Sequence, residues 1–258
     1  MIQTGICKMD ELLHGGIPKG KSLIYYAQPG VDYGIFGLHT IFNTLKKGGK
    51  GVFIVNSTTP NNIRDTFREF GWHIDFLNND FVFVDAFSSL IRSHSDEKFV
   101  ISNPDNIEEL DKKLLDLLRN SPACTVVFES LSTIMDLYGE KETIKSVKGW
   151  NEIAKVNGHV MIYNFTAWAY PRETLDLIKT ELFNAVVTIC GSGEYVIFSK
   201  YLGISKLDWK KEPEKLPQYE SGYIMNKGIV TPWLEYEING SLVNIMRENH
   251  AFECPSLL

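Results

Sequence analysis

The segment Ala27–Gly34 stands where a nucleotide-binding loop would be expected, between a short apolar run and a segment with helical periodicity. A loop that holds triphosphate reads G-x-x-x-x-G-K-[ST]: its glycines let backbone N–H groups approach the phosphates, its lysine pairs with them, and its hydroxyl holds Mg²⁺. In this chain those four positions carry Ala27, Asp32, Tyr33 and Gly34. The sequence therefore predicts a loop in the right place without the groups that bind Mg-ATP.

The same loop keeps one feature that attracts anions. A turn at Pro29-Gly30 precedes the expected helix, and a helix N-terminus offers backbone N–H groups and a positive dipole end. Against this, the carboxylate of Asp32 repels polyphosphate at short range. The candidate nucleotide-binding residues of this degenerate loop are Pro29, Gly30, Asp32, Tyr33 and Gly34.

Other patterns that could support catalysis are missing from the sequence. The six histidines are scattered, and no histidine or cysteine pair has the spacing of a metal site. No serine lies in the G-x-S-x-G context of a nucleophile elbow. We therefore expect no bound metal, and we expect free thiols at the four widely spaced cysteines, Cys7, Cys124, Cys190 and Cys254.

Composition and charge narrow the class of protein. The chain has 258 residues and a net charge of −6, which argues against binding driven by nucleic-acid phosphates. Its charged, non-apolar opening does not resemble a cleavable leader. No apolar stretch approaches the ~20 residues that span a bilayer. We expect a cytoplasmic protein with no membrane contact.

Short apolar runs alternate with helical segments, which is typical of a mainly parallel, twisted sheet covered by helices on both faces. The expected strands are nearly continuous apolar runs: Ser22–Ala27, Gly51–Asn56, Phe81–Asp85, Thr125–Glu129, His159–Asn164 and Ala185–Cys190. The expected helices are Ile35–Lys47, Pro60–Phe70, Pro104–Arg119, Ile144–Val156 and Pro171–Phe183. The sequence therefore predicts the α/β class.

The pattern changes after Cys190. A strand over Glu194–Lys200 is expected to form an antiparallel hairpin with the strand before it. The charged, proline-containing stretch Leu207–Gln218 is expected to be an exposed loop, followed by short strands at Gly222–Met225 and Gly228–Thr231 and then by a tail. Since no linker separates two parts, we expect one domain over residues 1–258, with a core of about 4–232 and a C-terminal extension of 233–258.

An aromatic loop, Trp168-Ala169-Tyr170-Pro171, follows the fifth expected strand. It should lie at the carboxyl edge of the sheet, where doubly wound folds bind ligands. Two interpretations remain open, a contact for a partner or small ligand and simple aromatic packing under a loop.

The opening of the chain carries a longer pattern. Thr4-Gly5-Ile6 is followed over Met9–Gly20 by MDELLHGGIPKG. This closely resembles the signature T-G-x-x-x-L-D-x-L-L-x-G-G-I-P-x-G that begins KaiC-like domains, a branch of the RecA-fold ATPases. More diffuse similarity extends from Thr4 to Pro232. The resemblance implies a RecA-like fold, while the activity depends on individual residues.

Three further catalytic parts of that family can be compared with the aligned residues. The pair of glutamates that activates water aligns with Ser57 and Thr58, which cannot act as bases at neutral pH and are expected to cap the next helix. The family's Mg²⁺-supporting aspartate aligns with Glu129, which could support a metal or make a structural hydrogen bond to Ser130 or a neighbouring loop. The family's late K-M-R-G aligns with the tetrad Lys200-Tyr201-Leu202-Gly203, in which the arginine is lost.

The leading hypothesis is a catalytically inactive KaiC-like pseudo-ATPase that binds a protein partner, such as an active paralogue or a signalling component. ATP and Mg²⁺ are then not expected as cofactors. One alternative is a weak ATP- or ADP-binding protein or ATPase that uses Glu129 and Lys200. Another is a recombinase-type accessory protein that binds DNA. Because nucleotide helps to join the family's hexameric rings, its loss favours a monomer or homodimer.

Overall fold

A computed structural model describes residues 1–74, 80–192, 199–209 and 231–248, whose strands form one ten-stranded sheet. The strand order is β10-β9-β8-β7-β1-β6-β5-β2-β3-β4. Pairing is parallel from β7 to β4 and antiparallel from β7 to β10. The strands are β1 (Ser22–Ala27), β2 (Gly51–Val55), β3 (Phe81–Asp85), β4 (Phe99–Val100), β5 (Thr125–Phe128), β6 (Val160–Thr166), β7 (Ala185–Ser192), β8 (Ser199–Leu207), β9 (Leu234–Asn239) and β10 (Leu242–Glu248).

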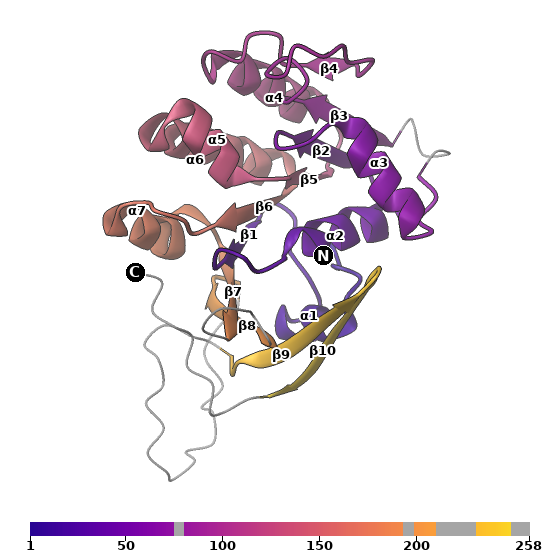
Figure 1. The fold of residues 1–258 in the computed structure, drawn as a ribbon, viewed down its shortest axis with the longest axis vertical. Helices are drawn as coiled ribbons and strands as arrows, with labels where there is room; N and C mark the ends of the chain where they lie inside the picture. The colour runs from indigo at the N-terminus through magenta and orange to yellow at the C-terminus, as the bar shows by residue number, and fades with distance from the viewer. Residues whose placement is uncertain (75–79, 193–198, 210–230, 249–258) are drawn as a thin grey trace.

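Helices cover both faces of the sheet (Figure 1). One face carries α1 (Cys7–Leu12), α2 (Gly34–Lys46) and α3 (Pro60–Glu69). The other carries α4 (Glu108–Asn120), α5 (Leu131–Tyr138), α6 (Glu140–Asn157), α7 (Arg172–Leu177) and a π-helical turn at Ile178–Leu182. Each face has its own apolar core, and all six residues of β1 between them are buried. Burial on both faces explains why every residue of this strand after Ser22 is aliphatic or aromatic.

The expected α/β architecture is confirmed, and the six expected apolar strands lie within two residues of their observed bounds. Three helix predictions were wrong in part. The helix expected from Pro104 begins only at Glu108, and the one expected from Ile144 begins earlier, at Glu140. The helix expected over Pro171–Phe183 divides into α7 and the π-helical turn. The sequence analysis missed the elements α1, β4, α5, β9 and β10.

The expected antiparallel pairing after Cys190 is found between β7 and β8. The expected bounds were wrong, because β7 runs on to Ser192 and β8 lies at Ser199–Leu207, with Leu207 buried rather than in an exposed loop. The predictions for Gly222–Met225 and Gly228–Thr231, and for most of Glu194–Lys200 and Leu207–Gln218, lie outside the described residues.

The residues of the N-terminal signature form a compact set of hydrogen bonds around Asp10 of α1. Asp10 Oδ1 accepts from the N–H of Thr4 (2.6 Å) and from its hydroxyl (2.8 Å), and Asp10 Oδ2 accepts from the N–H of Gly5 (3.3 Å). Ile2 and Ile17 exchange both backbone hydrogen bonds at 2.7 Å. These contacts fix the chain before it enters β1.

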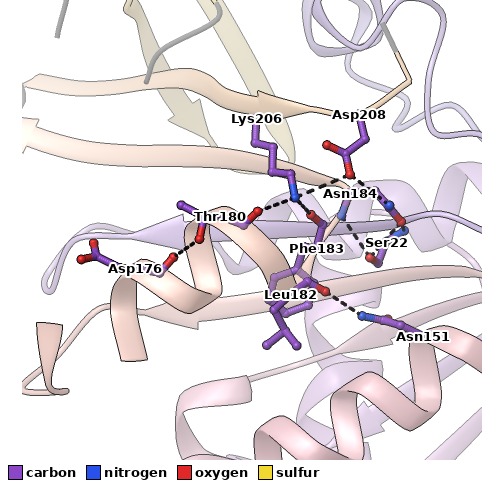
Figure 2. A network of polar contacts seen from close by, with 9 residues as sticks. All are labelled: Ser22, Asn151, Asp176, Thr180, Leu182, Phe183, Asn184, Lys206 and Asp208. Carbon is purple, nitrogen blue, oxygen red and sulfur yellow. Dashed lines mark hydrogen bonds and ion pairs between the residues drawn. The ribbon is translucent and has the colours of Figure 1, made fainter. Parts of the chain in front are cut away.

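A polar network holds β8 against the end of the π-helical turn (Figure 2). The ammonium of Lys206 donates to the carbonyls of Thr180 (2.8 Å) and Phe183 (2.7 Å) and lies 3.5 Å from the Asp208 carboxylate. Asn184 bonds Ser22 at the start of β1 and also the Asp208 carboxylate (3.2 Å). A lysine at a helix C-terminus satisfies carbonyls that have no partner within the helix.

Two further observations concern expectations from the sequence. Cys7 and Cys124 are free thiols, as expected, but Cys190 is disulfide-bonded, so the expectation of free thiols throughout was wrong. Among the helices that the structure describes, none combines the length and the apolar character needed to cross a bilayer.

Candidate functional site

The candidate nucleotide loop leaves the carboxyl end of β1 near the middle of the sheet and leads into α2 (Figure 1). The N–H of Gln28 donates to the Ile189 carbonyl (2.8 Å), and its side-chain oxygen accepts from the N–H of Gly191 (3.1 Å). Gly30 has a φ of +80°, a left-handed conformation that glycine adopts without strain. The loop is therefore tied to β7 before α2 begins.

Tyr33 occupies the position that the motif gives to lysine. Its ring is half-buried, and its hydroxyl lies 2.5 Å from Thr166 Oγ1 at the end of β6. Burial raises the pKa of Tyr33, the hydrogen bond to Thr166 lowers it, and the charges of Asp32 and Glu129 raise it further. The phenol is thus neutral at physiological pH, and a neutral group bonded to the protein itself stands in the place of the motif's cation.

Asp32 is exposed, and β9 braces the backbone beside it. The Asp32 carbonyl accepts from the hydroxyl of Tyr236 (3.1 Å), whose ring is only 1% exposed and packs edge-on against Phe36 of α2, with ring centroids 5.5 Å apart. Gly34, the first residue of α2, has open space where a Cβ would stand. Glycine at that position is therefore not demanded by packing.

Side chains join the ends of β2 and β5, where the aligned family carries catalytic carboxylates. Glu129 Oε2 accepts from the N–H groups of Asn56 and Ser57, both at 2.8 Å. The Asn56 amide donates to the Ser130 carbonyl (2.6 Å) and accepts from the Ser130 N–H (3.1 Å). Of the two interpretations of Glu129, this geometry matches a structural hydrogen bond to a neighbouring loop.

The expectation that Ser57 or Thr58 caps the next helix was wrong by one or two residues. Thr59 is the N-cap of α3, and its side-chain oxygen accepts from the N–H of Asn62 (3.3 Å). The hydroxyl of Thr58 instead accepts from the Asn62 amide group (2.6 Å). Pro60 in the first turn suits a helix start because it has no N–H to leave unpaired.

Lys200 reaches the same edge of the sheet through strand pairing. It lies opposite Gly191 of β7 and opposite Tyr236 of β9. The loop contacts both of these neighbours, through Gln28 and through Asp32 respectively. The fold therefore gathers the loop residues, Glu129 and Lys200 at one edge, as their alignment with the family required.

Sequence reasoning missed four residues that shape this edge, namely Gln28, Asn56, Thr166 and Tyr236. Asn56 and Thr166 are polar residues at the carboxyl ends of apolar runs, and that position is a usable signal. Tyr236 was missed because it comes from a strand that was not expected. Among the described residues, no cluster of three or more His, Cys, Asp or Glu is placed to hold a metal ion.

Known proteins resemble this chain in sequence and in fold. A model of the family described as ATPase: KaiC matches residues 2–159. A UPF0273 protein of Thermotoga maritima is 33% identical over 136 residues, or 52% of this chain and 56% of that protein. A UPF0273 protein of Sulfurisphaera tokodaii is 36% identical over 137 residues, or 52% of this chain and 48% of that protein. The chain thus spans about half the length of the curated relatives that it matches.

The crystal structure of a KaiC-like protein from the archaeon Pyrococcus horikoshii is similar over almost the whole fold. The TM-score is 0.69 with 17% sequence identity, covering 95% of this chain and 98% of that one. At this identity the likeness concerns the fold alone.

Proposed function

The chain belongs to the KaiC family of ATPases, and from that premise we propose that it is a catalytically inactive member that acts by binding a protein partner. The observation that carries the proposal is the contact between the Tyr33 hydroxyl and Thr166 Oγ1 at 2.5 Å. It places a bulky neutral side chain at the position from which a lysine would reach the phosphates.

The residues at the loop fit Mg-ATP poorly. Asp32 adds a negative charge beside the position where a triphosphate would carry several. Gly34 offers no hydroxyl for Mg²⁺, and the carboxylate of Glu129 already accepts two backbone N–H groups. To bind Mg-ATP, the protein would have to break the hydrogen bonds of Tyr33 and Glu129. It has no lysine in this loop whose positive charge would offset that cost.

The groups needed for hydrolysis are also replaced. Ser57 and Thr58 have hydroxyls where a general base would need a carboxylate. Leu202 is buried on β8 and cannot stabilise the charge that develops during phosphoryl transfer, as an arginine finger does. Since each such part contributes orders of magnitude to rate, their combined replacement supports a non-enzymatic role.

The proposed partner is an active relative or a signalling component, and the proposed state of the free protein is a monomer or homodimer. Nucleotide bound at subunit junctions contributes to the rings of this family, and a chain that binds none lacks that contribution. The proposed function therefore rests on a surface of the protein that binds this partner.

Calorimetry and phosphate release with Mg-ATP at millimolar concentration test the proposal. We expect neither heat nor turnover from the natural chain. The quadruple variant Ala27→Gly/Asp32→Gly/Tyr33→Lys/Gly34→Thr restores all four motif residues and should gain Mg-ATP binding. Tyr33→Phe, which removes only the hydroxyl that contacts Thr166, should not. Turnover by the natural chain that is lost in Glu129→Gln and Lys200→Met would reject the proposal in favour of a noncanonical ATPase.

A further inference from the structure

The loop after β6 holds an indole in solvent. Trp168 is 65% exposed, although the residues on both sides of it in the loop are anchored. The N–H of Ala167 donates to the Ala27 carbonyl (2.8 Å), and the hydroxyl of Tyr170 donates to the Ser132 carbonyl (3.1 Å) and to Asp136 (2.7 Å). An aromatic side chain on a fixed backbone loses little conformational entropy when a partner covers it.

The backbone of this loop adopts a costly conformation to present the indole. Ala169 has a φ of +49°, which is left-handed and costs an alanine about 1–2 kcal/mol. The ring of Tyr170 stacks on Phe165 beneath the loop, with centroids 5.4 Å apart. Aromatic packing therefore accounts for Tyr170 and leaves Trp168 as the residue turned to solvent.

The loop is also connected to the candidate nucleotide site. Thr166, which bonds Tyr33, exchanges hydrogen bonds with the Ser132 hydroxyl: its N–H donates at 2.8 Å and its carbonyl accepts at 3.3 Å. The Ser132 carbonyl in turn accepts from Tyr170. A continuous set of hydrogen bonds thus runs from Tyr33 to the loop that carries Trp168, within the chain itself.

Acidic side chains lie near the tyrosines at this edge of the sheet. Asp136 and Glu140 act on Tyr170 and raise its pKa, after the larger effect of burial, and Asp32 acts in the same way on neighbouring Tyr33. Asp32 and Asp136 are exposed, while Glu140 is half-buried and accepts from the Thr174 hydroxyl. The cation nearest along the chain, Arg172, lies 3.8 Å from Asp176. The tyrosine that anchors the Trp168 loop is thus bonded to an exposed carboxylate, Asp136, and the exposed cation that follows the loop, Arg172, lies beside a carboxylate of its own.

We propose that the Trp168 surface, defined as Trp168 with Asp32, Asp136 and Glu140, docks an arginine- or lysine-containing segment of a partner protein. The inference deepens the proposed function, because it gives the chemistry of the partner at the same edge of the sheet. An arginine guanidinium stacks on an indole face and forms forked hydrogen bonds with carboxylates, so one side chain can use both features of this surface.

The charge decides between kinds of partner. An acidic segment, or a nucleic acid, would bring phosphates or carboxylates against three carboxylates and would be repelled. A purely apolar segment would cover Trp168 but would leave those carboxylates desolvated without partners. A cationic segment avoids both costs.

The probe is a fluorescently labelled peptide of alternating arginine and glycine, and the matched peptide carries citrulline, which keeps the shape of arginine without its charge. Fluorescence anisotropy measures the binding of each peptide to the full chain at low and at high salt. Trp168→Ala should weaken binding about tenfold, as expected for a central aromatic contact. Trp168→Phe should restore part of the loss.

Control variants separate a site from general attraction to an acidic protein. Asp136→Asn and Glu140→Gln remove charge but keep hydrogen-bond acceptors, and each should weaken binding by several-fold at low salt. Glu237→Gln, an exposed acid on β9, and Val156→Ala, an exposed apolar residue on α6, should leave binding within twofold. Melting temperatures of all variants would show that each is folded.

The proposal is overturned if Trp168→Ala binds like the natural chain, if the citrulline peptide binds equally well, or if Glu237→Gln has the same effect as Asp136→Asn. The outcome is independent of the nucleotide test. Binding of Mg-ATP would reject the inactive site and leave the peptide result standing, and failure of the peptide would leave the absence of Mg-ATP binding untouched.

Discussion

Glu129 illustrates how a residue at a family's catalytic position can serve a structural purpose. Its carboxylate accepts two backbone N–H groups from the turn after β2, one of them from buried Asn56. An ionised acceptor strengthens such hydrogen bonds, and the buried N–H would be costly to leave without a partner. Glu129 thereby holds the ends of β2 and β5 together.

Glu129→Ala should lower the free energy of unfolding by about 1–3 kcal/mol, because the Asn56 N–H would lose its acceptor inside the protein. Glu129→Gln keeps one side-chain oxygen and should cost about half as much. Urea unfolding measures both values, with Glu237→Gln on β9 as an exposed control. Equal stability of all three variants would contradict the structural role and would leave the carboxylate free for a ligand.

At the scale of elements, α2 determines how closely the candidate loop approaches the sheet. Gly37 in its first turns lies so near to β5 and β6 that an added Cβ would stand 2.9 Å from Val127 Cγ1 and 3.1 Å from the Asn164 amide nitrogen. His39, further along α2, contacts the carbonyl of Ser241 in the β9–β10 turn through Nε2 at 2.6 Å. The helix is thus fixed by the sheet on one side and by the hairpin on another.

Two glycine-to-alanine changes test this close packing. In both α2 and α6, alanine should favour the helix by up to about 1 kcal/mol over glycine. At Gly149, an exposed position with open space around it, that gain should appear as increased stability. At Gly37 we expect a net loss of about 1–3 kcal/mol, because the methyl group would push against Val127 and Asn164. Thermal or urea unfolding measures whether each variant is more or less stable than the natural chain. Stabilisation by Gly37→Ala would show that α2 can move away from the sheet freely.

At the scale of the whole molecule, the sequence predicts the buried part of the fold far better than its edge. Strands such as β1 and β5 are buried on both faces, so an apolar run marks them without knowledge of their neighbours. In β9 buried and more exposed residues alternate, and in β10 exposed and half-buried residues alternate over Leu242–Met246 with Asn244 interrupting the apolar residues, so neither strand stands out as an apolar run. A usable signal was nevertheless present, since Asn239-Gly240 between them is a typical hairpin turn.

Part of the candidate site could likewise be predicted from the sequence and part could not. The alignment placed Tyr33, Glu129 and Lys200 at one edge of the sheet, and strand order is sufficient to bring them there. The partners of these residues depend on side-chain directions in the folded protein. Thr166 and Asn56 carry a signal in their position after apolar runs, but their bonds to Tyr33 and Glu129 are visible only once β6, β2 and β5 are in place.

The whole molecule also buries many weak acids, and this makes its stability depend on alkaline pH. Burial is the largest cause of raised pKa values at Cys124, which reaches about 12, and at the phenols of Tyr25, Tyr26, Tyr163 and Tyr236. In the unfolded chain these groups ionise at about pH 8.5 for the thiol and about pH 10 for the phenols. Each contribution to stability is therefore complete below those values and is lost as pH rises toward the folded pKa.

We expect the free energy of unfolding to be nearly constant from about pH 7 to 8 and to fall by on the order of 9 kcal/mol by about pH 11, since each of the five groups adds about 1.4 kcal/mol per pH unit above its unfolded pKa. Lys179, whose pKa is lowered mainly by burial, acts in the opposite direction but is a single group. Urea unfolding across this range measures the fall, and near-ultraviolet absorbance of tyrosinate provides the control, because the buried phenols should ionise only as the chain unfolds. A stability that is flat to about pH 11, or phenols that titrate normally in the folded protein, would mean that water reaches these rings and that the two cores are less closed than their packing indicates.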